Sequence, residues 1–259
     1  MDAVERGELE AFRSLYAAAP AALGAQTKEV GDALALRLDG ASEVTMFNRV
    51  LGLGLDRPAS EEQLDAALAF LDGVHAYVAV APDAEPPELA RWLEQRGHVP
   101  DHGWTKFSRP AADPPRARTQ LRVERVDDGE PFADAAVRGF GEPLVSHEWL
   151  ATLASREGWH CFVAFDGVEP AGAGALFVLG DLGWVGIGAT KPQHRGKGAQ
   201  SALLAARIAA AAEAGCSVVV TETGEPVDGV PGGSYRNIVR AGFAPRYVRA
   251  NYVLRPAAS

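Results

Sequence analysis

The residues with the clearest chemical potential form the hexapeptide 193–198, Gln-His-Arg-Gly-Lys-Gly. It lies between a β-like run at residues 184–189 and an alanine-rich helical run that ends at Gly215. Closely spaced glycines before a helix leave several backbone N–H groups free at its positive end, and such a turn binds phosphate. Arg195 and Lys197 add positive charge at the same place. The alternative is a glycine-rich turn that only begins a helix.

Two widespread phosphate-binding loops do not match this segment. A P-loop needs a glycine, four residues, and then Gly-Lys followed by Ser or Thr. This chain has Lys191 at the first glycine position and Gly198 directly after Lys197. A dinucleotide fingerprint needs a third glycine where Ser201 stands. The segment therefore does not indicate a nucleotide hydrolase or a dinucleotide-binding protein.

The pattern Q-x-x-G-x-G between a strand and a long helix resembles the acetyl-CoA pyrophosphate loop of the GNAT (Gcn5-related) N-acetyltransferases. Residues 216–223 are apolar and β-branched, which predicts a buried strand, and residues 234–243 predict a short helix ending in Arg-x-Gly-Phe. Over residues 119–256 the predicted order β-α-α-β-β-β-α-β-α-β-β is similar to that of the family. The remaining predicted elements are a strand at 121–126, helices at 132–140 and 147–155, a hairpin of 159–165 with 171–179 turning at Asp166-Gly167, and two strands over 246–254.

Composition limits the class of protein. The chain has 259 residues and a formal charge of −9, which argues against general affinity for nucleic acid or an anionic membrane. No stretch approaches the roughly 20 apolar residues of a membrane span, and the first residues lack the order of a signal peptide. Cys161 and Cys216 fall in apparent buried strands, which predicts reduced core thiols, and no Cys/His spacing indicates a metal site. We expect a cytoplasmic protein, from a bacterium because arginine dominates over lysine.

The first hundred residues resemble the second half. Residues 91–100 align with residues 236–245 without a gap, and residues 50–58 are similar to residues 185–192. A helix at residues 60–71 and a strand at 75–80 follow in the expected order. The fold class predicted is α/β (α+β), with two GNAT-like domains, each a mixed, mostly antiparallel sheet flanked by helices. Chance similarity of two α/β segments is the alternative.

The first half differs where the second half has its glycine-rich loop. Ser60 is a predicted N-cap, Glu61 and Glu62 lie in the first turn, and Gln63 completes a capping box. The helix start would thus be satisfied by its own side chains, and the two carboxylates would repel a pyrophosphate. We therefore expect three parts. They are a degenerate GNAT-like domain without cofactor loop at residues 1–110, a linker at 111–118, and a GNAT domain that binds acetyl-CoA at 119–259.

The resemblance implies cofactor-binding residues in three segments. In the family, main-chain groups of a splayed strand pair with pantetheine, and one N–H there polarises the thioester carbonyl. The pyrophosphate is held by loop amides, and polar side chains on the short helix add contacts. By position the predicted cofactor-binding residues are Ile187, Gly188, Ala189, His194, Arg195, Gly196, Lys197, Gly198, Ala199, Ser234 and Asn237. For Ser234 a helix cap is the alternative.

The catalytic residues are less defined, because the chain departs from the family. Many members carry a tyrosine, as general acid for the thiolate, where this chain has Ile238. Tyr235 is almost one helical turn away and is the predicted substitute. Glu222, late on a predicted strand, is the predicted general base for the acceptor ammonium. Other candidates are the acids and bases of the segment before the second helix, and two tyrosines of the last strands: Glu142, His147, Tyr247 and Tyr252.

The sequence thus predicts an acetyl-CoA-dependent N-acetyltransferase of GNAT type. It would transfer an acetyl group to the amine of a small molecule by direct nucleophilic attack, as a monomer or homodimer. The expected partner is a small-molecule amine acceptor, with no nucleic acid, membrane or metal. The alternative is a non-catalytic acyl-CoA-binding sensor or scaffold module.

Overall fold

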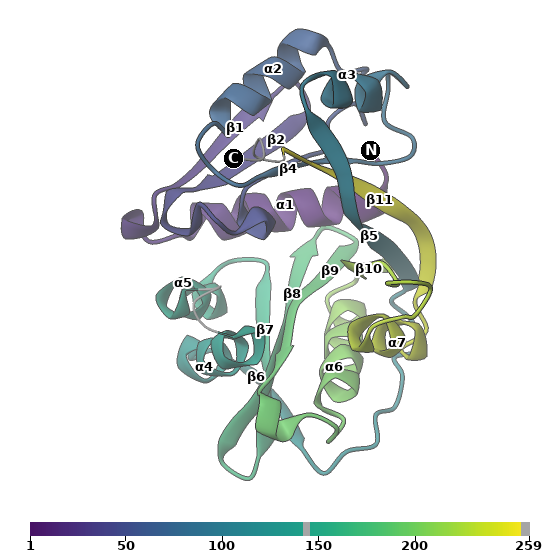
Figure 1. Ribbon diagram of the computed structural model, residues 1–259. Helices are drawn as coiled ribbons and strands as arrows, with labels where there is room; N and C mark the ends of the chain where they lie inside the picture. Colours follow the sequence, from purple (N-terminus) through teal and green to yellow (C-terminus); the bar gives the residue numbers. More distant parts are fainter. Residues whose placement is uncertain (142–145, 255–259) are drawn as a thin grey trace. The chain divides into compact units, whose positions relative to one another are not determined.

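A computed structural model describes residues 1–141 and 146–254. The chain divides into two compact units. Unit 1 comprises residues 1–106 together with the chain from residue 247, and unit 2 comprises residues 107–246. Both units are mixed α/β structures with mostly antiparallel strand pairs flanked by helices, so the predicted fold class is confirmed (Figure 1).

Unit 1 orders its strands β1-β2-β3-β4-β11-β5. The β3–β4 pair is parallel, whereas the β1–β2, β2–β3 and β4–β11 pairs are antiparallel. A core of aliphatic side chains joins the sheet to α2 and α3. The elements are α1 (Ala3–Ala17), β1 (Ala25–Val30), β2 (Ala33–Leu38), β3 (Arg49–Leu51), α2 (Glu61–Phe70), β4 (Tyr77–Val80), α3 (Leu89–Gln95) and β5 (His98–Pro110).

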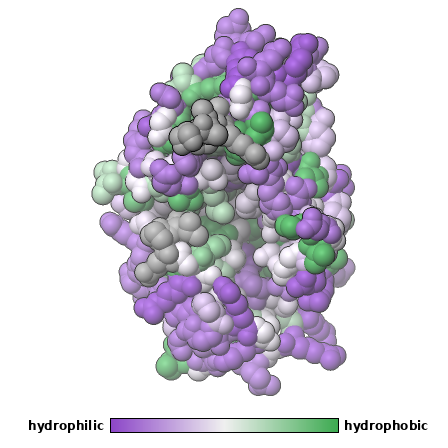
Figure 2. All heavy atoms as spheres, in the orientation of Figure 1, coloured by the Kyte–Doolittle hydropathy of each residue, from purple (hydrophilic) through white to green (hydrophobic). Residues whose placement is uncertain are grey.

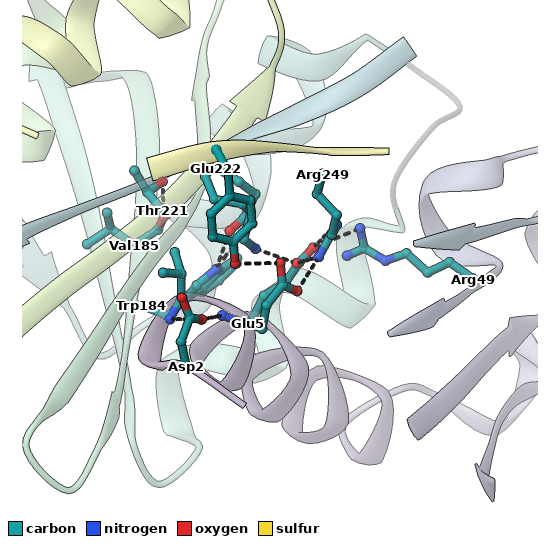
Figure 3. Close-up of polar contacts among 12 residues, drawn as sticks. Asp2, Glu5, Arg49, Trp184, Val185, Thr221, Glu222 and Arg249 are labelled. Carbon is teal, nitrogen blue, oxygen red and sulfur yellow. Dashed lines mark hydrogen bonds and ion pairs between the residues drawn. The ribbon is translucent and has the colours of Figure 1, made fainter. Parts of the chain in front are cut away.

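Unit 1 also holds a buried cluster of charged side chains. Glu8 on α1 lies 2.7 Å from Nζ of Lys106 and 3.0 Å from Nη1 of Arg49, and it accepts from Arg249 on β11. Arg249 in turn lies 2.8 Å from Glu5. Figure 3 shows these two side chains directed toward each other. Burial alone would raise the pKa of Glu8, but the three cations outweigh it and hold that pKa well below its usual value. Each buried charge therefore has a partner of opposite sign.

Unit 2 orders its strands β10-β9-β8-β7-β6, and the end of β5 lies beside β10. The pair β9–β10 is parallel and the others are antiparallel. Figure 1 shows α4 and α5 on one face of this sheet, and α6 and α7 on the other. The elements are β6 (Arg122–Val126), α4 (Gly129–Phe140), α5 (His147–Ala151), β7 (Trp159–Asp166), β8 (Glu169–Leu179), β9 (Leu182–Thr190), α6 (Ala199–Glu213), β10 (Val218–Gly224), α7 (Gly233–Arg240) and β11 (Ala244–Leu254).

The end of the chain differs from the expectation. In place of two strands over residues 246–254 there is one, β11, which pairs with β4 of unit 1 through Ala250 to Val253. Residues 107–110 of β5 belong instead to unit 2, where Ala111 N donates to Ser217 O over 3.1 Å. The second half of the sequence thus gives most of its last strand to unit 1, whereas the first half gives only the final four residues of β5 to unit 2. The compact units accordingly do not follow the boundaries 1–110 and 119–259.

The repeat seen in the sequence has a structural counterpart in element order. The series β3-α2-β4-α3-β5 in the first half matches β9-α6-β10-α7-β11 in the second. Gly97 and Gly242 follow the two short helices with φ of 81° and 85°, a left-handed conformation that favours glycine. The shared Gly of the aligned windows therefore ends a helix in both halves.

Cys161 and Cys216 are free and buried, as predicted, and burial raises the pKa of Cys161 to about 12. Within residues 1–141 and 146–254, no helix has the length and apolar character that crossing a membrane requires. The same residues include no group of His, Cys, Asp and Glu arranged to hold a metal ion. The face in Figure 2 is mostly hydrophilic, with small apolar patches.

Candidate active site

The candidate site lies in unit 2, where two parallel strands part. The ladder between β9 and β10 runs from the pair Leu182–Val218 to the pair Trp184–Val220 and ends there. One residue further, Thr221 Oγ1 donates to Val185 O over 2.7 Å, so a side chain replaces the backbone bond. Beyond this point the described residues include no further backbone pair between β9 and β10.

A bulge interrupts β9 directly after the parting point. In the pairing with β8, Ala175 faces Gly186 and Ala173 faces Ala189, so Ile187 and Gly188 share one opposing residue. Ile187 has φ 52°, which a β-branched residue adopts only where its surroundings impose it. The predicted pantetheine-binding segment is therefore an irregular stretch of strand.

The glycine-rich loop leads from β9 into α6. A short 3₁₀ turn, Pro192–His194, uses the amides of His194 and Arg195 for bonds to Lys191 O and Pro192 O. The loop amides that follow, on Gly196, Lys197, Gly198 and Ala199, donate to no acceptor in the described part of the chain. Gly198 is the N-cap of α6 and provides no side-chain cap.

The conformation of the loop requires glycine at two positions. Gly196 and Gly198 have φ of 81° and 84°. An added Cβ on Gly198 would lie 3.1 Å from Arg118 O, whereas Gly196 has open space around it. Four free amides at the positive end of a helix are suited to an anion, whereas the amides of His194 and Arg195, which the sequence also predicted as contacts, are used within the turn.

The His194 side chain anchors the loop to the β7–β8 turn. Its Nδ1 lies 3.0 Å from Asp166 and its Nε2 lies 3.2 Å from Glu169, while Nζ of Lys197 lies 2.6 Å from Asp166. Hydrogen bonds from Lys197 and His194 lower the pKa of Asp166, and a hydrogen bond from His194 lowers that of Glu169. The buried His194 side chain thus anchors the loop, and its role as a cofactor contact stays a prediction.

Glu222 lies on the face of the sheet that α4 and α5 cover. Its two oxygens accept from Nε1 of Trp184 at 3.1 and 3.2 Å, and Figure 3 shows the indole pointing at the carboxylate. Trp184 packs edge-on against Trp159 at 6.1 Å between ring centroids, and its ring covers Gly186, where a Cβ would lie 1.8 Å from it. The carboxylate is therefore held in one orientation near the bulge.

The other predicted residues are more scattered. Tyr235 packs edge-on against Phe107 at 5.0 Å in the core on the α6 side, so the structure does not bring it to Glu222. Ser234 is exposed and Asn237 is half-buried on α7. The alternative of a Ser234 cap is wrong, because the N-cap is Gly232.

The remaining described candidates have contacts of their own. Tyr247 and Tyr252 belong to unit 1: Tyr247 donates to Glu5 over 3.1 Å, and Tyr252 packs in the core. His147 is exposed, with Nε2 3.7 Å from Glu130. Glu142 lies outside the described residues.

Sequence reasoning missed three side chains at this site. Trp184 orients Glu222, and Gln200 Nε2 donates to Ala189 O at 2.7 Å and to Thr190 Oγ1 at 3.0 Å. Arg207, on the third turn of α6, reaches the bulge itself. The sequence did offer a signal for Arg207, because it lies on the apolar face of a helix. A polar side chain in that position needs a buried hydrogen-bond partner.

The corresponding place in unit 1 is closed. After β3 and β4, Glu85 N donates to Gly54 O and Ala59 N donates to Glu85 O, each over 2.8 Å. A Cβ on Gly54 would lie 2.3 Å from Glu85 O, so the two segments touch along their backbones. At the start of α2, Ser60 and Gln63 form the capping box that the sequence predicted.

The bulge of β9, the glycine-rich loop and α6 follow one another directly in the chain. Residues 128–229 match the model of the acetyltransferase (GNAT) family. The match covers the central part of unit 2, and in these residues the chain is similar to the GNAT family.

Solved structures share this fold at low identity. A GCN5-related N-acetyltransferase from Kribbella flavida has a TM-score of 0.63 at 15% identity, covering 98% of this chain and 96% of that one. Another from Sphaerobacter thermophilus has a TM-score of 0.61 at 16% identity, covering 87% and 82%. A tandem GNAT protein from the clavulanic acid biosynthesis pathway, solved without AcCoA, has a TM-score of 0.57 at 16% identity, covering 87% and 79%. No curated protein sequence matches the chain.

Proposed function

We propose that the protein is an acetyl-CoA-dependent N-acetyltransferase whose acceptor is the amine of a small molecule. The observation that carries the proposal is the group of free amides from Gly196 to Ala199, placed directly after an open, bulged strand. The strand edge and the loop follow one another along the chain. Together they suit a ligand that has a phosphate group for the loop amides and an amide-containing arm for the strand edge.

The residues present fit acetyl-CoA. Free amides on Gly196, Lys197, Gly198 and Ala199 would hold the pyrophosphate, and the open space beside Gly196 leaves room for it. The main chain of Ile187 and Gly188 would pair with pantetheine, with Ala189 held in place by Gln200. Asn237 and Ser234 on α7 are further proposed contacts. Acetyl-CoA supplies an activated thioester carbonyl that an amine can attack.

This chain's own groups would act on charge and protons. Glu222 would accept the proton of the acceptor ammonium, and the Trp184 N–H keeps its carboxylate oriented for that task. The N–H of Ile187 would donate to the carbonyl oxygen as negative charge develops on it. A thiol has an ordinary pKa of about 8.5, so departure of the thiolate does not require an acid. Tyr235 is retained only as a candidate acid.

The N-terminal half would not bind a second cofactor molecule. In unit 1, the backbone bonds of Glu85 fill the place of the opening, and Ser60 with Gln63 satisfies the helix start. We assign it a structural role, or one in shaping the acceptor site. A small amine is the proposed acceptor, because a single anchored carboxylate suits one cationic group.

The test is calorimetric titration of the full-length protein with acetyl-CoA and with CoA. Lys197→Glu places a carboxylate among the four amides, and Lys28→Glu, on the surface of unit 1, is the matched charge reversal. We expect one site per chain, at least a hundredfold weaker in Lys197→Glu and unchanged in Lys28→Glu. Absence of binding by the unaltered protein would refute the proposal.

Release of CoA separates the enzyme from the sensor or scaffold that also fits the loop. The protein is mixed with acetyl-CoA and a panel of small amines, and free thiol is followed with time. Amine-dependent release supports the transferase. Saturable binding without release for any amine, including polyamines, amino sugars and amino acid amides, supports the non-catalytic module instead.

A further inference from the structure

A single buried cation, Arg207, lies beside the bulge of β9. Its side chain is only 2% exposed, and it pairs with no carboxylate among the described residues. Burial lowers the pKa of Arg207 to about 9, so the guanidinium is still charged at neutral pH. A buried charge without a counter-ion is costly, whereas an apolar residue at this helix position would pack without that cost. The contacts of Arg207 should therefore explain why a cation stands at this position.

The guanidinium bonds only to main-chain carbonyls. Nε donates to Leu203 O over 3.0 Å, and Nη1 donates to Ala175 O over 3.3 Å and to Gly186 O over 3.0 Å. Ala175 and Gly186 are the cross-strand pair that borders the bulge. Arg207 therefore joins β8 and β9 at the last regular pair before Ile187.

Gly174 makes room for this contact. It is the β8 residue opposite the bulge, and a Cβ there would lie 2.6 Å from Cζ of Arg207 and 2.8 Å from its Nε. The backbone of Gly174 is not in a left-handed conformation, so the glycine is needed for space rather than for φ. The absence of a side chain at Gly174 thus allows the Arg207 guanidinium to reach the bulge.

The contact between Arg207 and Gly186 O also sets the direction of the Ile187 N–H. In a trans peptide the C=O and the N–H point in opposite directions. The carbonyl of Gly186 faces Arg207 on the β8 side, so the N–H of the same peptide, which belongs to Ile187, faces the β10 side. There the ladder has ended at the pair Trp184–Val220, and the strand edge is open.

We infer that Arg207 is a positioning residue for acyl transfer: it fixes the peptide between Gly186 and Ile187 so that the Ile187 N–H is aimed, as a strengthened donor, into the opening between β9 and β10. The strengthening follows from charge, because a cation at the carbonyl oxygen polarises the peptide and makes its N–H a better donor. The ligand it serves is the carbonyl oxygen of a thioester. The inference rests on the proposed function.

Selective labelling can observe this donor directly. The chain has three isoleucines, at positions 187, 208 and 238, so [¹⁵N]isoleucine gives three amide signals. Ile187→Leu assigns the Ile187 signal, and Ile238 serves as a distant reference. Acetyl-CoA and CoA are added in turn, and the difference between the two Ile187 shifts reports the bond to the acetyl carbonyl.

Four variants are compared with the unaltered protein. Arg207→Met removes the charge, Arg207→Lys keeps charge without the two-carbonyl bridge, and Gly174→Ala displaces the guanidinium while leaving the arginine in the chain. Arg156→Met, an exposed arginine of unit 2, is the control. Arg207→Met also leaves two buried carbonyls without a donor, so this variant can fail to fold. In that case Gly174→Ala tests whether the guanidinium positions the Ile187 N–H.

We expect the acetyl-specific Ile187 shift to disappear in Arg207→Met and Gly174→Ala, to recover partly in Arg207→Lys, and to persist in Arg156→Met. The affinity for CoA should change less than about threefold, and kcat should fall about a hundredfold, as for loss of one oxyanion donor. An unchanged acetyl-specific shift in folded Gly174→Ala overturns the inference while leaving the proposed function intact. Failure of the unaltered protein to bind acetyl-CoA refutes the proposed function instead.

Discussion

Two helix starts in this protein, at α2 and at α6, occupy the same place in the repeated element order and are treated in opposite ways. At α2, Ser60 and Gln63 satisfy the end amides with their own side chains. At α6, Gly198 gives no side-chain cap, and four amides from Gly196 to Ala199 have no acceptor in the described residues. A capped helix start gains stability, whereas an uncapped one leaves its amides available to an anion.

The strands before these helices also differ: in the part of the chain that the structure describes, backbone bonds join the segments after the strands in unit 1 but not in unit 2. In unit 1 the segments after β3 and β4 stay bonded through Glu85 and Gly54. In unit 2 the pair β9–β10 stops at Trp184–Val220, and the β9 bulge opens the edge beyond it. One scaffold can therefore be closed or opened by a few residues without a change in element order.

The largest expected effect concerns the open unit. Glu222→Gln should lower kcat/KM for the amine by 10²- to 10⁴-fold, because it removes the proposed general base. Acetyl-CoA affinity by calorimetry should stay within threefold, since Glu222 lies away from the loop amides. Glu213→Gln, exposed at the end of α6, is the matched control. Full activity of Glu222→Gln would assign proton removal to another group.

The next largest effect is expected where unit 1 is closed. Gly54→Ala should lower the free energy of unfolding by about 3 kcal/mol, because the new Cβ meets Glu85 O and the residue has φ 78°. Gly73→Ala has φ 80° and open space, so it should cost only about 1 kcal/mol. Urea unfolding of both variants gives the difference. Equal losses would mean that the close backbone approach at Gly54 does not matter.

A smaller effect is expected at the α2 cap. Ser60→Ala should cost about 1 kcal/mol of unfolding free energy, because an end amide loses its acceptor. The number of acetyl-CoA molecules bound per chain should stay at one. A second binding site in this variant would show that the cap alone, and not the closed strands, keeps unit 1 from binding the cofactor.

The smallest effect concerns pH and the anchor of the loop. Lys197 and His194 lower the pKa of Asp166, and His194 lowers that of Glu169. Unfolded carboxylates titrate at about 3.9 and 4.3, so these contacts contribute fully above about pH 4.5 and are lost as pH falls through the lower folded pKa values.

Melting temperatures between pH 6 and pH 3 measure this loss. The double variant Asp166→Asn with Glu169→Gln should show a smaller drop than the unaltered protein, and the exposed control Asp127→Asn should follow the unaltered protein. The surface location of both carboxylates keeps the expected difference small. Identical curves of melting temperature against pH for all three proteins would show that Asp166 and Glu169 do not anchor the loop.

Much of this structure could be predicted from local sequence. The strand-loop-helix order around residues 184–214, the hairpin at Asp166-Gly167 and the capping box at Ser60 depend on residues close together in the chain, so spacing and residue type were sufficient. The place of β11 in unit 1 was not visible, because strand partners are chosen by long-range pairing that no local pattern encodes.

The sequence by itself determined the conformation of the glycine-rich turn, since closely spaced glycines before a helix permit both the left-handed backbone and the free amides. Only the tertiary structure decided which amides stay free, that His194 faces carboxylates, and that Trp184 holds Glu222. The same holds for Arg207, whose partners are carbonyls of two strands brought together by folding. Contacts between distant segments assign a side chain its task, and they exist only once the chain has packed.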